Sequence, residues 1–307
     1  MSPVSRGRKP KKKPKQQRKS AGQERVIIGA GADEPCDCPE CTGEPDLDAV
    51  IDQFIGVNAE LPTASDPLDG EVGGAFILAL VGSVGPDFEY AMVDGILPAI
   101  EERATPEALA TLLAVGSVAD GLVGTAADSA ADRLAASGIP RPPWADEALL
   151  PVGSAEHQVL ADADETMSVL SCTFNRAGRA HAMVVIVDEF DCGAASEIAL
   201  LEADELAGVL DDFRTEMRAE DIELVAEAIA PEEFRWQVDN ALSIRADHDF
   251  EDAESGEEPE LEEEEITTYE SMAALLRRRL RDLPRSDKPP RPHGDGIEFT
   301  PEGPQQM

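Results

Sequence analysis

Aromatic residues are scarce in this chain of 307 residues, of which Phe, Trp and Tyr make up only 4%. A core must therefore rest on Ala, Val, Leu and Ile, which the apolar fraction of 42% allows. Five cysteines in a chain of this length do not suggest a disulfide scaffold, and reduced thiols in a cytosol fit better. The longest apolar stretch, residues 75–84, is interrupted by Gly82 and is far shorter than the roughly 20 residues that cross a membrane. These absences argue against a membrane span and favour a cytoplasmic protein.

Basic residues are rare outside the N-terminal segment. Residues 1–19 hold nine of the 26 Lys and Arg and no acid, whereas the other 288 residues carry 17 bases and 63 acids. A body this acidic repels nucleic acid phosphates and anionic membranes, and it favours solubility and basic partners. A high-GC genome or a salty cytoplasm would give the same composition without a specific partner.

The basic segment is the start of a tail, residues 1–45. Its first 25 residues cannot bury enough apolar surface to offset the entropy of ordering, so disorder is predicted. Lys and Arg suit phosphate contacts without sequence readout, but no aromatic residue is interleaved for base stacking. Non-specific contact with nucleic acid or an acidic partner is one interpretation, and a solubilising or protein-binding tail is the other. The candidate contact residues are Arg6, Arg8, Lys9, Lys11, Lys12, Lys13, Lys15, Arg18 and Lys19.

Three cysteines lie close together near the end of this tail, at Cys36, Cys38 and Cys41. Residues 38–43 resemble a zinc knuckle, in which a two-residue spacer lets both sulfurs reach one ion. A structural zinc site needs four ligands, and Cys172 or Cys192 would have to supply the fourth. Zinc binding, a redox or regulatory thiol cluster, and no site at all stay open. If a metal binds, we predict zinc, because thiolate-rich ligation suits it.

Helical patterns dominate residues 46–138. Short helices rich in Ala and Gly predict stacked helical hairpins. The expected core face of the second helix includes Val72, Phe76 and Leu80. The helices are expected at 47–61, from Pro67, from Pro86 with a kink or break at Pro98, from Pro106 to about 115, and at 119–136 before Gly138.

A Pro-rich linker, residues 139–154, leads into a predicted α+β domain at residues 155–250. Residues 183–187 are apolar on both faces, which indicates a buried central strand. The segment 222–225 fits either helix or strand. Strands are expected at 166–174, 179–188 and 197–201, a turn at 175–178, and helices at 203–218 and 231–249, the last with Phe234, Val238, Leu242 and Ile244 inward.

The C-terminal part alternates between polar runs and one helix. Residues 251–265 hold ten acids and no base, so a solvated, disordered run is predicted. A last helix is expected within 266–283, and residues 284–307 should be loose. The apolar stripe of this last helix is Met272, Leu275, Leu276, Leu280 and Leu283, and Arg277, Arg278 and Arg281 face elsewhere. The predicted fold is α+β: an all-helical segment of stacked hairpins, then a small unit with a short β-sheet, flanked by disordered charged tails.

Catalytic motifs are missing: no Ser-centred elbow, phosphate loop or His-Glu-X-X-His pattern is present. His181, Asp188 and Cys192 suggest a catalytic set, but seven positions along a strand span about 23 Å and end on opposite faces. We therefore expect His181 to be a strand-end histidine with a local hydrogen bond. Asp188 and Asp191 are expected to organise the following turn. Trp236 fits a core or interface residue, or a ligand platform.

Four segments, residues 36–41, 140–144, 181–193 and 234–238, resemble an uncharacterised family from high-GC actinobacteria. The resemblance covers most of the chain after residue 35. It implies no activity.

Three functions follow as hypotheses. The first, which the lack of convergent catalytic residues favours, is a non-enzymatic binding or adaptor protein with an unknown protein partner. The second is an enzyme of unrecognised type, with a site between the helical and α+β domains near Trp144, His181 or Cys192. The third is a small zinc protein that uses the three N-terminal cysteines.

Overall fold

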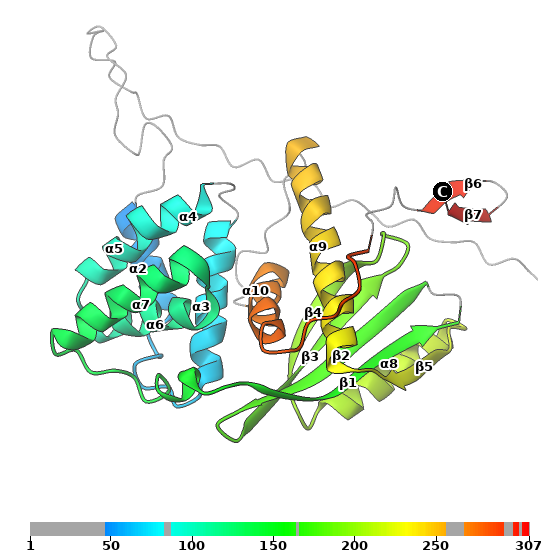
Figure 1. Ribbon diagram of the computed structural model, residues 1–307, viewed down its shortest axis with the longest axis horizontal. Coiled ribbons are helices and arrows are strands. Elements are labelled where there is room, and N and C mark those ends of the chain that lie inside the picture. Colours follow the sequence, from blue (N-terminus) through cyan, green and yellow to red (C-terminus); the bar gives the residue numbers. More distant parts are fainter. Residues whose placement is uncertain are drawn as a thin grey trace, which may run out of the picture. The chain divides into compact units, whose positions relative to one another are not determined.

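The computed structural model describes residues 47–82, 87–163, 166–255, 267–291, 297–300 and 303–306, which all belong to one unit, residues 45–307. Helices come first, and an antiparallel sheet with further helices follows, so the predicted α+β class is confirmed (Figure 1). None of the described helices is both long and apolar enough to cross a membrane. The first helices are α2 (Leu47–Val57), α3 (Pro67–Gly82), α4 (Phe88–Tyr90), the π-helical turn η1 (Ala91–Ile96), α5 (Leu97–Glu102), α6 (Pro106–Val118) and α7 (Gly121–Ala136).

Local sequence determines where these helices begin and end. Helix α3 begins at Pro67 and α6 at Pro106, as predicted, because proline has the right φ for a first turn and lacks an N–H that would stay unbonded there. The Thr105 hydroxyl caps α6 by accepting a hydrogen bond from the Ala108 N–H at 3.1 Å. Gly138, with φ of +104°, follows the end of α7.

The helix that contains Pro98 is continuous rather than broken. Pro98 has no N–H and cannot make the regular bond to the carbonyl four residues earlier. The π-helical turn η1 lies directly before it, and the Leu97 N–H bonds to the Met92 carbonyl, five residues back. The expected kink or break is therefore a local widening of the helix.

Helix α3 approaches α6 closely because it has glycine at the contact. A Cβ on Gly74 would lie 2.1 Å from the Ala114 carbonyl oxygen of α6. Helix α3 also contacts α10 (Tyr269–Leu280), so it is covered on more than one side. The predicted core face is wrong: Leu80 is 37% exposed, and Val72 and Phe76 are only half-buried. The buried apolar side chains of α3 are instead Ala75, Ile77 and Val81. Helix α6 contacts α7 as well, and the arrangement of these helices as stacked hairpins stays a prediction.

The sheet has five antiparallel strands in the order β4-β3-β2-β1-β5. The first four form a meander, and helix α8 (Leu206–Ala219) connects β4 to β5 at the opposite edge. Strand β3 has a neighbour on each side, which confirms the predicted buried strand. Ala177 and Gly178 both have positive φ, as a tight hairpin between β2 and β3 requires. The strands are β1 (Gly153–Asp162), β2 (Met167–Arg176), β3 (Arg179–Asp188), β4 (Ala194–Glu202) and β5 (Leu224–Ala228).

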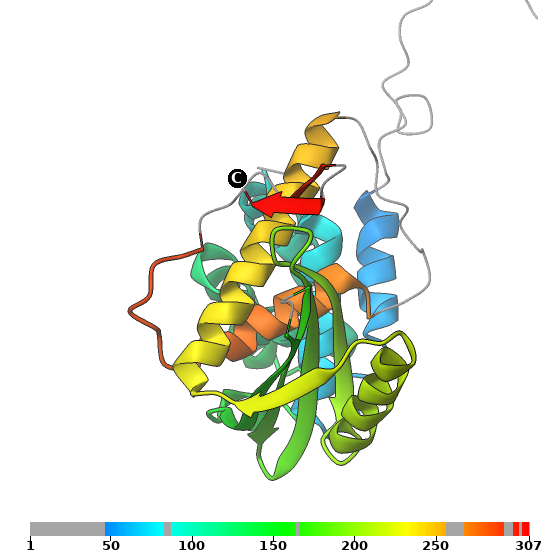
Figure 2. The same ribbon diagram turned by 90° about the vertical axis from the view of Figure 1, so that its right-hand side faces the viewer.

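Helices cover both faces of this sheet. Helix α8 packs on one face through Leu206 and Leu210, which join Val184 of β3 in one apolar cluster. Helix α9 (Pro231–Ser255) and α10 lie on the other face, as Figure 2 shows. The inward residues predicted for α9 and the whole apolar stripe predicted for α10 are buried there.

The structure corrects several segment boundaries. The sequence pattern does not predict strand β1, because a bulge with positive φ at Glu156 interrupts the alternation of apolar and polar residues. The ambiguous segment 222–225 leads into strand β5. Helix α9 continues to Ser255, so residues 251–255 of the acidic run are helical rather than disordered. The segment after α10 is not loose over 284–291, where several residues bond to α9. A two-stranded sheet, β6 (Ile297–Thr300) with β7 (Gly303–Gln306), follows.

Candidate functional site

The three residues named for an enzyme site are not brought together. Trp144 is buried, and its Nε1 donates to the Leu61 carbonyl at 2.9 Å, so the segment predicted as a linker packs against the helices. His181 lies near the start of β3, whereas Cys192 lies in the turn beyond its end. Asp188 organises that turn as predicted, since its Oδ1 accepts from the Phe190 N–H at 2.9 Å.

His181 belongs to a group of four buried polar side chains that we call the buried ion cluster: Glu71, Arg176, His181 and Arg279. The Arg279 guanidinium donates two bonds to the Glu71 carboxylate, at 2.7 and 2.5 Å. Arg176 Nη1 donates to the same carboxylate at 2.7 Å, and Arg279 Nε donates to His181 Nε2 at 3.2 Å. Their exposed fractions are 1% for Glu71 and Arg279, 4% for Arg176 and 5% for His181. The cluster joins α3, β2, β3 and α10.

Burial and charge set the protonation states in this cluster. Burial alone would raise the pKa of Glu71, but the bonds and charges of Arg279 and Arg176 outweigh it and hold that pKa below its usual value. Burial, with a further contribution from Arg279, lowers the pKa of His181 to about 4. His181 is therefore neutral at pH 7, and its Nε2 is free to accept the Arg279 hydrogen bond. The prediction of a local hydrogen bond for His181 is therefore wrong, since its partner Arg279 is 98 positions away in the sequence.

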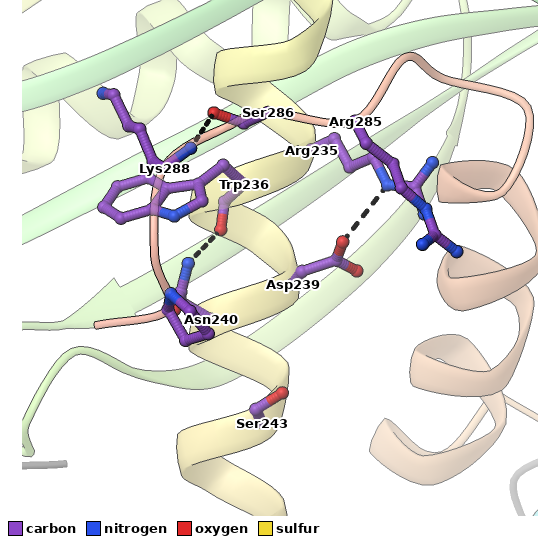
Figure 3. Close-up of a pocket in the computed structure, with 9 residues that line it drawn as sticks. Arg235, Trp236, Asp239, Asn240, Ser243, Arg285, Ser286 and Lys288 are labelled. Atoms are coloured by element: carbon purple, nitrogen blue, oxygen red, sulfur yellow. Dashed lines mark hydrogen bonds and ion pairs between the residues drawn. The ribbon is translucent and has the colours of Figure 1, made fainter. Parts of the chain in front are cut away.

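A separate feature, on the sheet face with α9 and α10, is a hollow of about 330 Å³ between α9 and the segment after α10 (Figure 3). Arg235, Arg285 and Lys288 line it, together with Trp236 and Asp239. Arg235 Nε bonds to Asp239 at 3.2 Å, whereas Arg285 is exposed and has no partner among the described residues. The hollow therefore presents one solvent-exposed guanidinium.

Trp236 is an interface residue between α9 and the C-terminal segment, which is one of its two predicted roles. Its Nε1 donates to the Pro289 carbonyl at 2.9 Å. Lys288 Nζ lies 4.8 Å from the ring centroid and the Arg291 guanidinium lies 5.4 Å from it, both within cation–π range. Two cations therefore pack against the ring that a stacking ligand would need.

A second hollow of about 420 Å³ adjoins the first, since Arg235 and Asp239 line both. Arg277, Arg278 and Arg281 of α10 and its C-terminal end form one wall. These three arginines face away from the apolar stripe, as the sequence predicted. Apolar side chains of the helical region also line it, including Leu78, Phe88 and Val123.

The two hollows together form what we call the cationic groove. Six cations and three acids line it, although the chain from residue 47 onward carries 16 bases and 56 acids. The rest of that region therefore has 10 bases against 53 acids, so positive charge is concentrated at the groove. Four of its cations already pair with acids, namely Arg235 with Asp239, Arg278 with Asp282, Arg281 with Asp120 and Lys288 with Glu233. Its cations are Arg235, Arg277, Arg278, Arg281, Arg285 and Lys288.

The predicted metal and tail residues lie outside the described part of the chain. This holds for Cys36, Cys38 and Cys41 and for the nine bases of residues 1–19, so zinc binding and nucleic-acid contact stay predictions. Among the described residues, no group of three or more His, Cys, Asp or Glu is placed to hold a metal. Cys172 is buried, and burial raises the pKa of its thiol to about 12, which makes it a poor nucleophile.

Comparison with known proteins gives no indication of function. No protein-family model, curated protein or solved structure matches the chain. The resemblance to an actinobacterial family stays a prediction, and the functional argument rests on the geometry of the groove.

Proposed function

We propose that this protein is a non-enzymatic, cytoplasmic binding or adaptor protein whose cationic groove receives an acidic, partly apolar segment of a partner protein. The observation that carries the proposal is the concentration of positive charge: six cations gather in one groove of a strongly acidic chain. Complementary charge in a confined surface directs partner choice and orientation.

The chemistry of the two hollows supports a peptide occupant. The first offers the exposed guanidinium of Arg285, which has no partner among the described residues, together with polar groups of Asn240 and Ser243. The second offers apolar side chains, including Leu78 and Val123, beside the α10 arginines. An extended segment in which acidic and apolar residues alternate would satisfy both, because guanidinium groups bind carboxylates through paired hydrogen bonds.

A nucleic acid is a poorer fit for this groove. Single-stranded nucleic acids are held largely by bases that stack on open aromatic rings. The ring of Trp236 instead has Lys288 and Arg291 packed against it. The acidic surface around the groove also repels a long run of phosphates more strongly than a short peptide.

The test is fluorescence anisotropy with a short labelled peptide in which Glu alternates with Leu. We expect binding that weakens as salt rises toward about 0.15 M. Reversing two charges, with Arg285→Glu and Lys288→Glu, should weaken it about tenfold or more, which corresponds to about 1.4 kcal/mol. The matched control is Arg214→Glu with Arg218→Glu on α8, which packs on the opposite face of the sheet.

The control separates a groove from an effect of net charge, since both double variants change the charge equally. Equal weakening in the two variants would show that the groove has no special role. Failure of any acidic peptide to bind would also reject the proposal. Tight RNA binding that the groove variants weaken, with no peptide competition, would identify a nucleic acid as the occupant instead.

The basic tail supports a second candidate, because residues 1–19 concentrate nine bases without one acid. In that case the tail holds RNA or DNA non-specifically while the groove acts independently. Deleting residues 1–19 should then abolish RNA binding and leave peptide binding unchanged. RNA binding that survives this deletion would rule out the tail.

A further inference from the structure

The buried ion cluster holds unequal numbers of positive and negative charges. Two guanidiniums, Arg176 and Arg279, share one carboxylate, Glu71. His181 contributes no charge at pH 7, because its pKa is about 4. The cluster therefore carries one net positive charge, with all four side chains at least 95% buried. An uncompensated charge in a protein interior is strongly unfavourable.

The excess charge is localised on Arg176. Arg279 uses Nε, Nη1 and Nη2, all in bonds to Glu71 or His181. Arg176 uses only Nη1, and its Nε and Nη2 are buried without a hydrogen-bond partner among the described residues. Besides burial, Arg176 is influenced by the charge of Glu71, the charge of Arg279, its hydrogen bond to Glu71 and the charge of Arg278, so one anion stands against two further cations.

The two unbonded nitrogens form one edge of the guanidinium. Nε–H and the adjacent Nη2–H point the same way in the fixed plane of the group, and this edge binds anions through two parallel hydrogen bonds. Arg176 thus presents paired donors at the place where the cluster lacks negative charge.

The geometry points to a small monovalent anion, such as chloride, bound in the interior by the Nε and Nη2 edge of Arg176. One negative charge would neutralise the cluster and satisfy both donors. Arg176 is 4% exposed, and protein atoms cover its Nε and Nη2 almost completely, so neighbouring side chains must shift to admit an anion, which favours a compact one over a large organic one. This site is separate from the cationic groove and does not depend on its function.

The experiment measures thermal unfolding of the whole protein at constant ionic strength, with chloride progressively replacing gluconate, which is too large for an enclosed site. We expect Tm to rise by roughly 3 °C for each tenfold increase in chloride above its dissociation constant. Arg176→Gln keeps a polar side chain but removes the charge and the donor edge, so its Tm should not rise with chloride. Arg285→Gln, in the open groove, is the matched control and should keep the wild-type slope.

A second measurement applies even if Arg176→Gln does not fold. Crystals of the wild-type protein grown in bromide should show anomalous density within hydrogen-bond distance of Arg176 Nε and Nη2. The inference is overturned if that density is missing, if wild-type Tm does not depend on chloride, or if Arg176→Gln shows the wild-type slope. A slope lost only in Arg285→Gln would assign the anion effect to the groove and would equally overturn it.

Discussion

The substitution Glu71→Gln tests how much the buried ion cluster contributes to stability. It keeps the size of the side chain and removes its charge. Glu71 accepts three hydrogen bonds from two guanidiniums, at 2.5 to 2.7 Å, and is 1% exposed. Glutamine keeps one oxygen, but its amide N–H groups would face a guanidinium N–H, donor against donor.

The expected loss is large because two buried arginines would remain without any carboxylate. Removing one partner of a buried ion pair costs roughly 3–5 kcal/mol. That is a large share of the roughly 5–15 kcal/mol that stabilises an ordinary domain. Urea unfolding at pH 7 measures the change as a lower midpoint at an unchanged slope.

The matched control is Glu101→Gln, because Glu101 also bonds to an arginine through both oxygens, at 2.7 and 2.6 Å to Arg133. That arginine is 60% exposed, so water replaces the lost contact, and the control should unfold close to wild type. Equal losses in the two variants would refute the argument from burial. Replacing Glu71, Arg176 and Arg279 together by Met should recover stability relative to Glu71→Gln, since no buried charge is then left unpaired.

Three further predictions follow from single contacts. The pKa of His181 is about 4 in the folded protein against 6.5 in the unfolded chain, so the unfolded chain binds more protons between these pH values. The free energy of unfolding should therefore fall by up to about 3 kcal/mol as the pH drops from 6.5 to 4. The variant His181→Asn should lose that part of the pH dependence, which urea unfolding at several pH values measures. Gly74→Ala should destabilise by about 1–3 kcal/mol in urea unfolding, because its Cβ would collide with the α6 backbone, whereas Gly208→Ala, with open space around it, should be neutral or stabilising. Thr105→Ala should cost about 1 kcal/mol in thermal or urea unfolding through loss of the α6 N-cap, and an unchanged midpoint would reject that role.

The sequence predicted well those elements whose signals are local. Prolines marked the starts of α3 and α6, and spacing identified the buried stripe of α10 and the inward residues of α9. Alternation and turn chemistry located the β2–β3 hairpin. Such signals are read from neighbouring residues and need no knowledge of tertiary contacts. The same reasoning did not predict strand β1, because a bulge at Glu156 interrupts its alternation.

The buried ion cluster could not be predicted, because its members come from four separate elements. Arg279 lies in an arginine-rich run whose other members face outward, and Glu71 lies in a glycine-rich helix, so each resembles a solvated charge. The sequence did contain one indication: Arg279 follows Leu276 by three residues and Leu275 by four, which places it on the same side of the helix as the apolar stripe. The groove was likewise hidden, since Arg235 and Arg285 meet only after α9 and the C-terminal segment pack together.

The contact between α3 and α10 has a consequence for how the chain is made. Glu71 and its bidentate partner Arg279 are 208 positions apart. At a synthesis rate of about 5–20 residues per second, the nascent Glu71 waits roughly 10–40 seconds for its partner to be translated. Until then the face of α3 that α10 covers, and the sheet face beside it, are open to solvent and to other chains. Ribosomes that stall or terminate before α10 would therefore release products with exposed apolar surface, which are natural substrates for chaperones and proteases.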